Sequence, residues 1–305
     1  MGTSVALRYR TVDVFTERVL EGNPLAVFPN APALPDATMQ RIARELNLSE
    51  TVFVLPPTRS DCAARLRIFT PSKELPFAGH PTIGTAFVLL DEGITGAKDG
   101  QLLLEEGVGP VGVRLDAGAK PMLWLTTPPI EPGRFFDARL CADVLGLSAA
   151  DLLDAPPRLL SAGNPTVFVA VRDKAAVDRA WIDLSGTTRL RSGDEPPFCV
   201  FVFTPTAEGA YSRMFAPDYG ISEDPATGSS TGPLAHFMIE HRLLRTSDET
   251  RFVSEQGTKM GRRSYLHVRV RTENGSGTIE VGGHVTPVAE ATMRLDADAC
   301  RGDAD

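Results

Sequence analysis

The stretch ELPFAGHPTIG at residues 74–84 returns in altered form as EDPATGSSTGP at residues 223–233. Each stretch runs into a mostly apolar segment, 81–93 and 229–244, which predicts a buried helix rather than a surface helix. Glycine lets the backbone approach a ligand closely, and proline suits the first turn of a helix. The two stretches therefore predict two equivalent helix starts. They share four residue pairs: Glu74 and Glu223, Pro76 and Pro225, Gly79 and Gly228, and Thr82 and Thr231.

Two further segments recur in the same order. GNPLAVF at 22–28 resembles GNPTVFV at 163–169, and RIFTP at 67–71 resembles RMFAP at 213–217. The three repeats all lie about half a chain apart, and their separation grows slightly along the chain, as small loop insertions would produce. So long a period indicates a duplicated domain, since solenoid units run about 20–50 residues. We therefore expect two pseudo-symmetric halves.

Strand patterns dominate both halves. Short runs rich in Val, Phe, Ile and Thr, bounded by Gly, Pro or Asp, are typical of strands. Helix patterns are fewer; one is DATMQRIAREL at 36–46, which starts at Asp36, a candidate N-cap, and has apolar residues on one face. Most predicted strands follow one another directly, which favours antiparallel or mixed sheets. They are LRYRTVDVF, TVFVLP, ARLRIF, MLWLTT, TVFVAV, CVFVF, YLHVRV and TIEVGG.

The fold class expected from these patterns is α+β. Each half is predicted to be a mostly antiparallel sheet or barrel wrapped around one central helix. The boundary is expected in the polar stretch DAGAKP, near Ala117–Pro121. This divides the chain into residues 1–119 and 120–305, and the C-terminal tail can pack back on the first half.

The composition excludes several classes of protein. The 305 residues are 42% hydrophobic and 23% charged, as in ordinary globular proteins. The net charge of -8 argues against nucleic-acid binding, which needs a basic patch. No apolar run reaches the about 18 residues that span a bilayer, and the N-terminus has no signal-peptide pattern, so we expect a cytoplasmic protein without a membrane partner. No CxxC pair is present, so neither a zinc site nor a disulfide framework is expected among Cys62, Cys141, Cys199 and Cys300.

The two helix starts, at 78–81 and 227–230, are candidate anion sites. First-turn N–H groups and the helix dipole both favour negative charge there. If the halves face each other, both starts point into one cleft and could hold a substrate carboxylate or a developing enolate. The alternative is that glycine and serine simply cap two core helices. Because the motif is duplicated, the binding interpretation is favoured.

Two polar residues beside these starts are candidates for proton chemistry. His80 could carry a proton near neutral pH, although a histidine beside a helix start is often only a hydrogen-bonding residue. Asp224 stands a few residues before the second helix. It also precedes a proline, and a turn residue is the plainer interpretation of that arrangement.

Glu50, in NLSETVFVLP, is the third candidate. Taken alone it could be a solvated acid at the start of a strand. Matching FVLP at 53–56 with FVFT at 201–204 places Glu50 opposite Phe198. An acid is then present in one half only, which is consistent with a catalytic base that is needed once.

Other catalytic patterns are missing from the sequence. It has no GxSxG nucleophile elbow, GSSTG lacks the lysine of a phosphate-binding loop, and no GxGxxG opens a helix after a strand. His236 and His241 do not have the i, i+4 spacing of a metal-binding pair on a helix. We therefore predict no metal site and no cofactor.

The motifs together resemble the PhzF-like isomerase family of phenazine biosynthesis. They are GNPLAVF, SETVF, ELPFAGHPTIG, DPATGSSTG and the late QGTKMGR and EVGG, and they span nearly the whole chain. The resemblance implies a fold similar to diaminopimelate epimerase, with the site between two halves. It also implies a homodimer.

The resemblance implies roles for five residues. Glu50, in SETVF, takes the position of the general acid–base. His80 and Asp224 match residues that orient the substrate, and Gly79 and Ser229 match the positions that hold its carboxylate. The phenazine enzyme moves a proton along an allylic system of trans-2,3-dihydro-3-hydroxyanthranilate without a metal or cofactor.

Cysteine chemistry distinguishes this chain from related epimerases and proline racemases, which use one cysteine at each helix start. Neither 78–81 nor 227–230 contains a cysteine, which disfavours a two-thiol mechanism. The predicted function is therefore a cofactor-independent isomerase acting on a small carboxylated molecule, such as a cyclic amino or hydroxy acid. The alternatives are a racemase or epimerase with carboxylate bases, and a non-catalytic protein that binds a small carboxylate.

Overall fold

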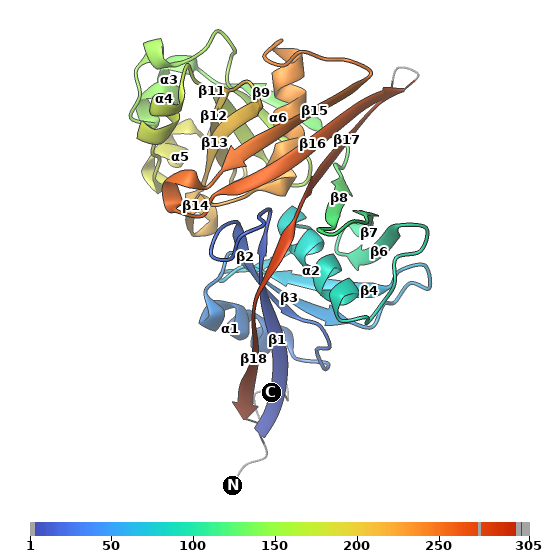
Figure 1. The fold of residues 1–305 in the computed structure, drawn as a ribbon. Helices are drawn as coiled ribbons and strands as arrows, with labels where there is room; N and C mark the ends of the chain where they lie inside the picture. Colours follow the sequence, from blue (N-terminus) through green and yellow to red (C-terminus); the bar gives the residue numbers. More distant parts are fainter. Residues whose placement is uncertain (1–3, 274–275, 297–299, 301–305) are drawn as a thin grey trace. The chain divides into compact units, whose positions relative to one another are not determined.

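The computed structural model describes residues 4–273, 276–296 and 300, and Figure 1 shows the course of the chain. Two compact units are formed, one by Met1–Leu125 with Gly283–Asp305 and the other by Thr126–Gly282. The boundary expected between residues 119 and 120 falls in the loop before β8 (Met122–Thr126). Both units combine helices with mostly antiparallel strands, so the predicted fold class is confirmed.

The first unit is a continuous run of paired strands in the order β18–β1–β2–β3–β4–β6–β7–β8. Its pairs are antiparallel except for β2 with β3 and β4 with β6. The last strand, β18, pairs along the whole of β1 (Figure 1, dark red beside blue). The elements are β1 (Ser4–Val14), β2 (Asn23–Phe28), α1 (Asp36–Leu46), β3 (Glu50–Leu55), β4 (Ala64–Phe69), β5 (Glu74–Leu75), α2 (Gly79–Asp91), β6 (Gln101–Glu106), β7 (Gly109–Asp116), β8 and β18 (Val285–Asp296).

The second unit has the order β9–β10–β11–β12–β13–β15–β16–β17. Again two pairs are parallel, β11 with β12 and β13 with β15. The elements are β9 (Glu131–Phe135), α3 (Ala138–Val144), β10 (Arg158–Ser161), β11 (Thr166–Ala170), α4 (Lys174–Arg179), α5 (Leu184–Leu190), β12 (Cys199–Pro205), β13 (Gly209–Ala216), β14 (Ile221–Asp224), α6 (Gly228–Glu240), β15 (Glu249–Gln256), β16 (Ser264–Glu273) and β17 (Ser276–Gly283).

The sheet pairing identifies the residue that matches Glu50. Leu25 on β2 lies opposite Glu50 on β3, and Thr166 on β11 lies opposite Cys199 on β12. Leu25 and Thr166 hold the same position in the two GNP segments, so Cys199 is the counterpart of Glu50. The predicted counterpart, Phe198, is wrong by one residue, because the local similarity of FVLP and FVFT is one position out of register with the pairing. Glu50 is still an acid without an acidic counterpart.

Helices α2 and α6 are the buried central helices that the sequence predicts. α2 contacts β1, β2, β3, β6, β7 and β18, and α6 contacts β10, β11 and β16. They begin at Gly79 and Gly228, slightly before the predicted starts, and they end at Asp91 and Glu240. Both glycines therefore belong to the first helical turn, where backbone N–H groups have no partner inside the helix.

Helix α1 has the predicted bounds and buries Met39 and Ile42. Asp36 as its N-cap is wrong. Pro35 stands in that position, and Asp36 is the first helical residue, where its carboxylate accepts a hydrogen bond of 2.6 Å from Arg67.

The short helices α3, α4 and α5 are not predicted by apolar periodicity, because six or seven residues hold too few turns to show it. Each follows an aspartate, Asp137, Asp173 or Asp183, whose side chain accepts a hydrogen bond from a first-turn N–H group. These caps were the signal available in the sequence. No helix in the described ranges is both long and apolar enough to cross a membrane.

The packing of α2 on its sheet predicts the effect of one substitution. A Cβ at Gly84 would lie 2.6 Å from Leu25 Cδ2 and 2.8 Å from Val14 Cγ2, two fully buried side chains. We expect Gly84→Ala to lower the free energy of unfolding by about 1–3 kcal/mol, because the core must move to admit a methyl group. Denaturant unfolding measures this change. Gly96→Ala is the matched control, since a Cβ there meets nothing within 4 Å, and equal stability of the two variants would contradict the prediction.

Candidate active site

Glu50 is the first residue of β3, and β3 lies between β2 and β4 in the sheet. Glu50 pairs with Leu25 of β2, the pairing with β4 begins at the next residue, Thr51, and Glu50 is only 8% exposed. The interpretation of Glu50 as a solvated acid is thus wrong. A carboxyl group with so little water around it needs polar partners from the protein.

His80, the second residue of α2, supplies such a partner. Its Nε2 lies 3.1 Å from Glu50 Oε2, and its Nδ1 lies 3.2 Å from the side-chain nitrogen of Asn23. An amide nitrogen can only donate a hydrogen bond, so Nδ1 is the acceptor of the Asn23 contact. The proton of a neutral ring is then on Nε2, where it faces the Glu50 carboxyl group.

Burial determines the charge of this histidine. His80 is 4% exposed, and its burial lowers the pKa of the ring to about 3. The short distance to a carboxylate would favour a charged ring, whereas desolvation favours a neutral one. We assign the neutral state, because desolvation is the effect that dominates the pKa of this ring. His80 and Glu50 are therefore a neutral imidazole beside a carboxyl group, with Nε2 and Oε2 3.1 Å apart but not in hydrogen-bond geometry, and not an ion pair.

The second unit repeats the contact between the GNP asparagine and the helix start. Asn164 donates from its side-chain nitrogen to Ser229 Oγ at 3.0 Å, as Asn23 does to His80. Each asparagine thus orients the second residue of a central helix. Neither was among the predicted site residues, although the GNP repeat marked both positions.

Asp224 ends β14 and is buried at the start of α6. Its carboxylate accepts a hydrogen bond from the Thr227 hydroxyl. Gln256 fixes the same turn, because its side-chain nitrogen donates to the Asp224 carbonyl oxygen at 2.8 Å and its side-chain oxygen accepts from the Thr227 N–H at 3.2 Å. The side chain of Asp224 is therefore held in place beside the second helix start.

The two helix starts have the same construction. Ala78 precedes α2 and Thr227 precedes α6, and in the structure as described neither residue caps the first turn with its side chain. Uncapped N–H groups at the positive end of a helix attract anions. Gly79 and Gly228 have no side chain that would cover them.

The predicted site residues are divided between the units. Glu50, Gly79 and His80 come together in the first, and Asp224 and Ser229 stand at the start of α6 in the second. Their roles in a reaction stay predictions, as does the cleft between the halves. No group of three or more His, Cys, Asp and Glu side chains in the described ranges could hold a metal ion.

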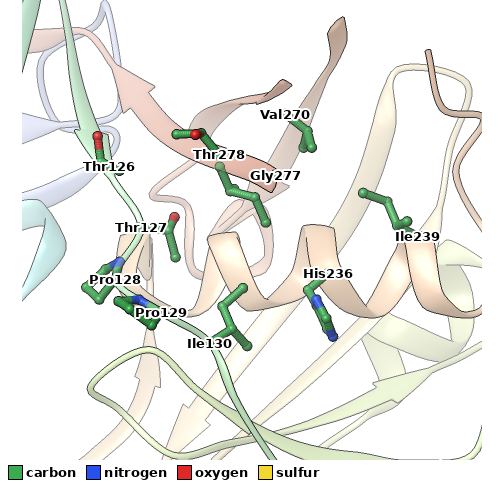
Figure 2. Close-up of a pocket in the computed structure, with 11 residues that line it drawn as sticks. Thr126, Thr127, Pro128, Pro129, Ile130, His236, Ile239, Val270, Gly277 and Thr278 are labelled. Atoms are coloured by element: carbon green, nitrogen blue, oxygen red, sulfur yellow. The ribbon is translucent and has the colours of Figure 1, made fainter. Parts of the chain in front are cut away.

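A separate cavity of about 600 Å³ lies in the second unit (Figure 2). It is lined by residues 126–130, by His236 and Ile239 of α6, and by parts of β16 and β17. It contains none of the predicted site residues, and His236 is its one titratable lining residue among those described. A single imidazole in mainly apolar surroundings indicates no particular reaction.

Known proteins resemble the chain along nearly its whole length. The family model for phenazine biosynthesis-like proteins matches residues 12–291. A trans-2,3-dihydro-3-hydroxyanthranilate isomerase from Pseudomonas aeruginosa is 38% identical, covering 94% of this chain and 99% of the relative. A predicted epimerase from the same species has a solved structure with a TM-score of 0.77 at 35% identity, covering 94% and 98% of the two chains. A PhzF-family phenazine biosynthesis protein from Bacillus anthracis, with a TM-score of 0.86 at 23% identity and coverage of 95% and 100%, shows the fold alone.

Proposed function

Because this chain belongs to the phenazine biosynthesis-like protein family and is an isomerase of that family, we propose that it moves a proton between two carbons of a small cyclic carboxylate. Glu50 is the proposed general acid–base. The observation that supports this role is its nearly buried carboxyl group, 3.1 Å from the ring nitrogen of His80. The name of the Pseudomonas aeruginosa relative makes trans-2,3-dihydro-3-hydroxyanthranilate the first substrate to test.

The proposed reaction needs one group that takes a proton from one carbon and returns it to another. The Glu50 carboxylate removes the proton, the electron pair of the broken C–H bond forms a new double bond to the adjacent carbon, and the pair of the old double bond moves to the far carbon. The protonated Glu50 then returns the proton at the far carbon of that allylic system. Protons and electrons balance, so the step needs no oxidant, reductant, metal or cofactor. Neutral His80 keeps its Nε2 beside the carboxyl oxygen and adds no positive charge there.

The remaining predicted residues complete the proposal. Gly79 and Ser229 would hold the substrate carboxylate at helix starts, and Asp224 would orient its polar substituents. We also propose a homodimer, from the family resemblance, and a cytoplasmic location, from the composition.

Proton NMR in deuterated water, with trans-2,3-dihydro-3-hydroxyanthranilate as substrate, tests the proposal. We expect conversion of the substrate with deuterium entering at the carbon that receives the proton, because a carboxyl proton exchanges with solvent between the two steps. A characterised isomerase of the same family is the positive control.

Other outcomes of this experiment would favour one of the alternative functions. Exchange at one stereocentre with inversion would show a racemase or epimerase. Binding of the substrate without turnover would favour a non-catalytic carboxylate-binding protein. No reaction beside an active control would exclude this substrate and leave the family assignment in place.

A further inference from the structure

Glu106 is a buried acid that the proposed reaction does not use. It ends β6 and is 6% exposed. Its Oε1 lies 2.6 Å from the hydroxyl oxygen of Thr82, in the first turns of α2. Among the residues that the structure describes, its Oε2 has no hydrogen-bond partner and no cation pairs with the group. An ionised carboxylate in this position would be costly.

The single hydroxyl proton of Thr82 bears on the protonation state of the Glu106 carboxyl group. The Thr82 hydroxyl oxygen also lies 2.7 Å from the carbonyl oxygen of Ala78. A hydroxyl group has one proton, and neither a carbonyl oxygen nor a carboxylate can donate one. Both contacts can be full hydrogen bonds if Thr82 donates to Ala78 and a protonated Glu106 donates to Thr82, whereas an ionised Glu106 would have to share the one Thr82 proton with Ala78. The geometry therefore favours a neutral acid.

The second unit has a neutral residue in the same place. EEG at 105–107 corresponds to EQG at 255–257, and the parallel pairs β4 with β6 and β13 with β15 have matching registers. Gln256 is thus the counterpart of Glu106. Its side-chain oxygen accepts a hydrogen bond from the Thr227 N–H at the start of α6. Glutamine has the shape of a protonated glutamate, so both helix starts are supported by an uncharged group.

We propose that Glu106 is a positioning residue, held as a neutral acid beneath the first turn of α2 so that this helix start can hold a substrate carboxylate. The inference rests on the proposed function, in which Gly79 contacts that carboxylate. The positive end of a helix stabilises a nearby negative charge within about one turn. An ionised Glu106, bonded to Thr82 within a turn of Gly79, would itself interact with the positive end of the helix and would repel the substrate carboxylate. A neutral Glu106 contacts Thr82 without adding a negative charge there.

The surroundings of Glu106 favour the neutral state. Burial raises the pKa of its carboxyl group to about 8, and a hydrogen bond that Thr82 donated to the ionised carboxylate would lower the pKa with smaller effect. His80, on the same helix, is neutral as well. The other charged residues on the elements packed around Glu106 are Glu50 on β3, Arg65 and Arg67 on β4, Glu74 on β5, Glu105 on β6, Asp91 at the far end of α2, and Arg114 and Asp116 on β7.

Carbon NMR of the protein labelled at its glutamate carboxyl carbons tests the protonation state without any substrate. The signal that disappears in Glu106→Gln should titrate near pH 8. Exposed glutamates should titrate at about pH 4.3. Titration of the Glu106 signal in that ordinary range would overturn the proposal.

Thermal unfolding gives a second test with the same variant. Above about pH 4.5 the unfolded chain releases a proton that folded wild-type protein keeps until about pH 8. The free energy of unfolding of wild type, relative to that of Glu106→Gln, should therefore fall between about pH 4.5 and about pH 8. Above about pH 8 this difference should stay constant. Glu105→Gln, at the half-buried neighbouring residue, is the matched control and should show no such fall, because the hydrogen bond from Thr58 lowers the pKa of that carboxyl group. Parallel pH curves for wild type and Glu106→Gln would overturn the neutral assignment.

Calorimetric binding of benzoate tests the connection with the helix start. Between about pH 7 and about pH 9.5, we expect wild type to lose about tenfold in affinity and Glu106→Gln to lose none. The same pH dependence in both proteins, or no benzoate binding at either pH, would overturn the role in anion binding. Turnover is not measured here, so a failure of the proposed function would show separately, as absent isomerisation with benzoate binding intact.

Discussion

Glu50→Gln is expected to lower kcat by about 10³-fold or more while leaving the fold intact. Glutamine has the shape of glutamate, and its side-chain oxygen can still face the Nε2–H of His80. It cannot take a proton from carbon. The substrate should therefore bind nearly as well as before, and the chemical step should fail. Steady-state kinetics with the substrate established by NMR measures the change in kcat and KM separately.

Two controls make this result specific to the proton transfer. Glu45→Gln removes a carboxylate from the exposed face of α1 and should leave kcat unchanged. Circular dichroism and thermal unfolding of Glu50→Gln should match wild type. Activity within about tenfold of wild type in Glu50→Gln would contradict its role as the base. A large rise in KM at constant kcat would show a role in binding instead.

The helix starts and many strands could be predicted because each is a local pattern. Gly79, Pro81 and the apolar residues that follow occupy one short stretch, which is enough to indicate a buried helix and its first turn. Duplication strengthened the signal, because the second stretch at 223–233 repeats the first. Duplicated residues also mark the support of each start, since the GNP asparagine contacts the second residue of the central helix in both units.

The contacts that assemble the site could not be predicted, because they join residues far apart in the sequence. Asn23 and His80 are separated by 57 positions, and Thr82 and Glu106 by 24. Only the packing of α2 against β2 and β6 brings these side chains together. The wrong counterpart of Glu50 has a similar origin, because strand pairing rather than local similarity determines which residues correspond.

The contact of Asn23 with His80 leads to the second large expected effect, a loss of about 10²-fold in kcat in Asn23→Asp. In wild type the amide donates to Nδ1, so the ring proton stays on Nε2 and faces Glu50. A carboxylate in place of the amide can only accept a hydrogen bond, so it favours the ring tautomer with the proton on Nδ1. Nε2 then has no proton, and its unshared electron pair faces the Glu50 carboxylate. Glu50 then faces an acceptor in place of an N–H. Nitrogen NMR of the His80 ring would show the exchanged tautomer directly.

The pH dependence of Asn23→Asp separates a tautomer effect from simple loss of packing. The added carboxylate favours a doubly protonated ring, and such a ring donates from both nitrogens. The defect should therefore shrink as the pH falls, whereas a packing defect should not depend on pH in this way. Asn164→Asp is the matched control in the second unit, where the partner is the Ser229 hydroxyl, which can donate as readily as accept. A loss in Asn164→Asp as large as in Asn23→Asp, with the same pH profile, would show that the effect comes from added charge near a helix start and not from the histidine tautomer.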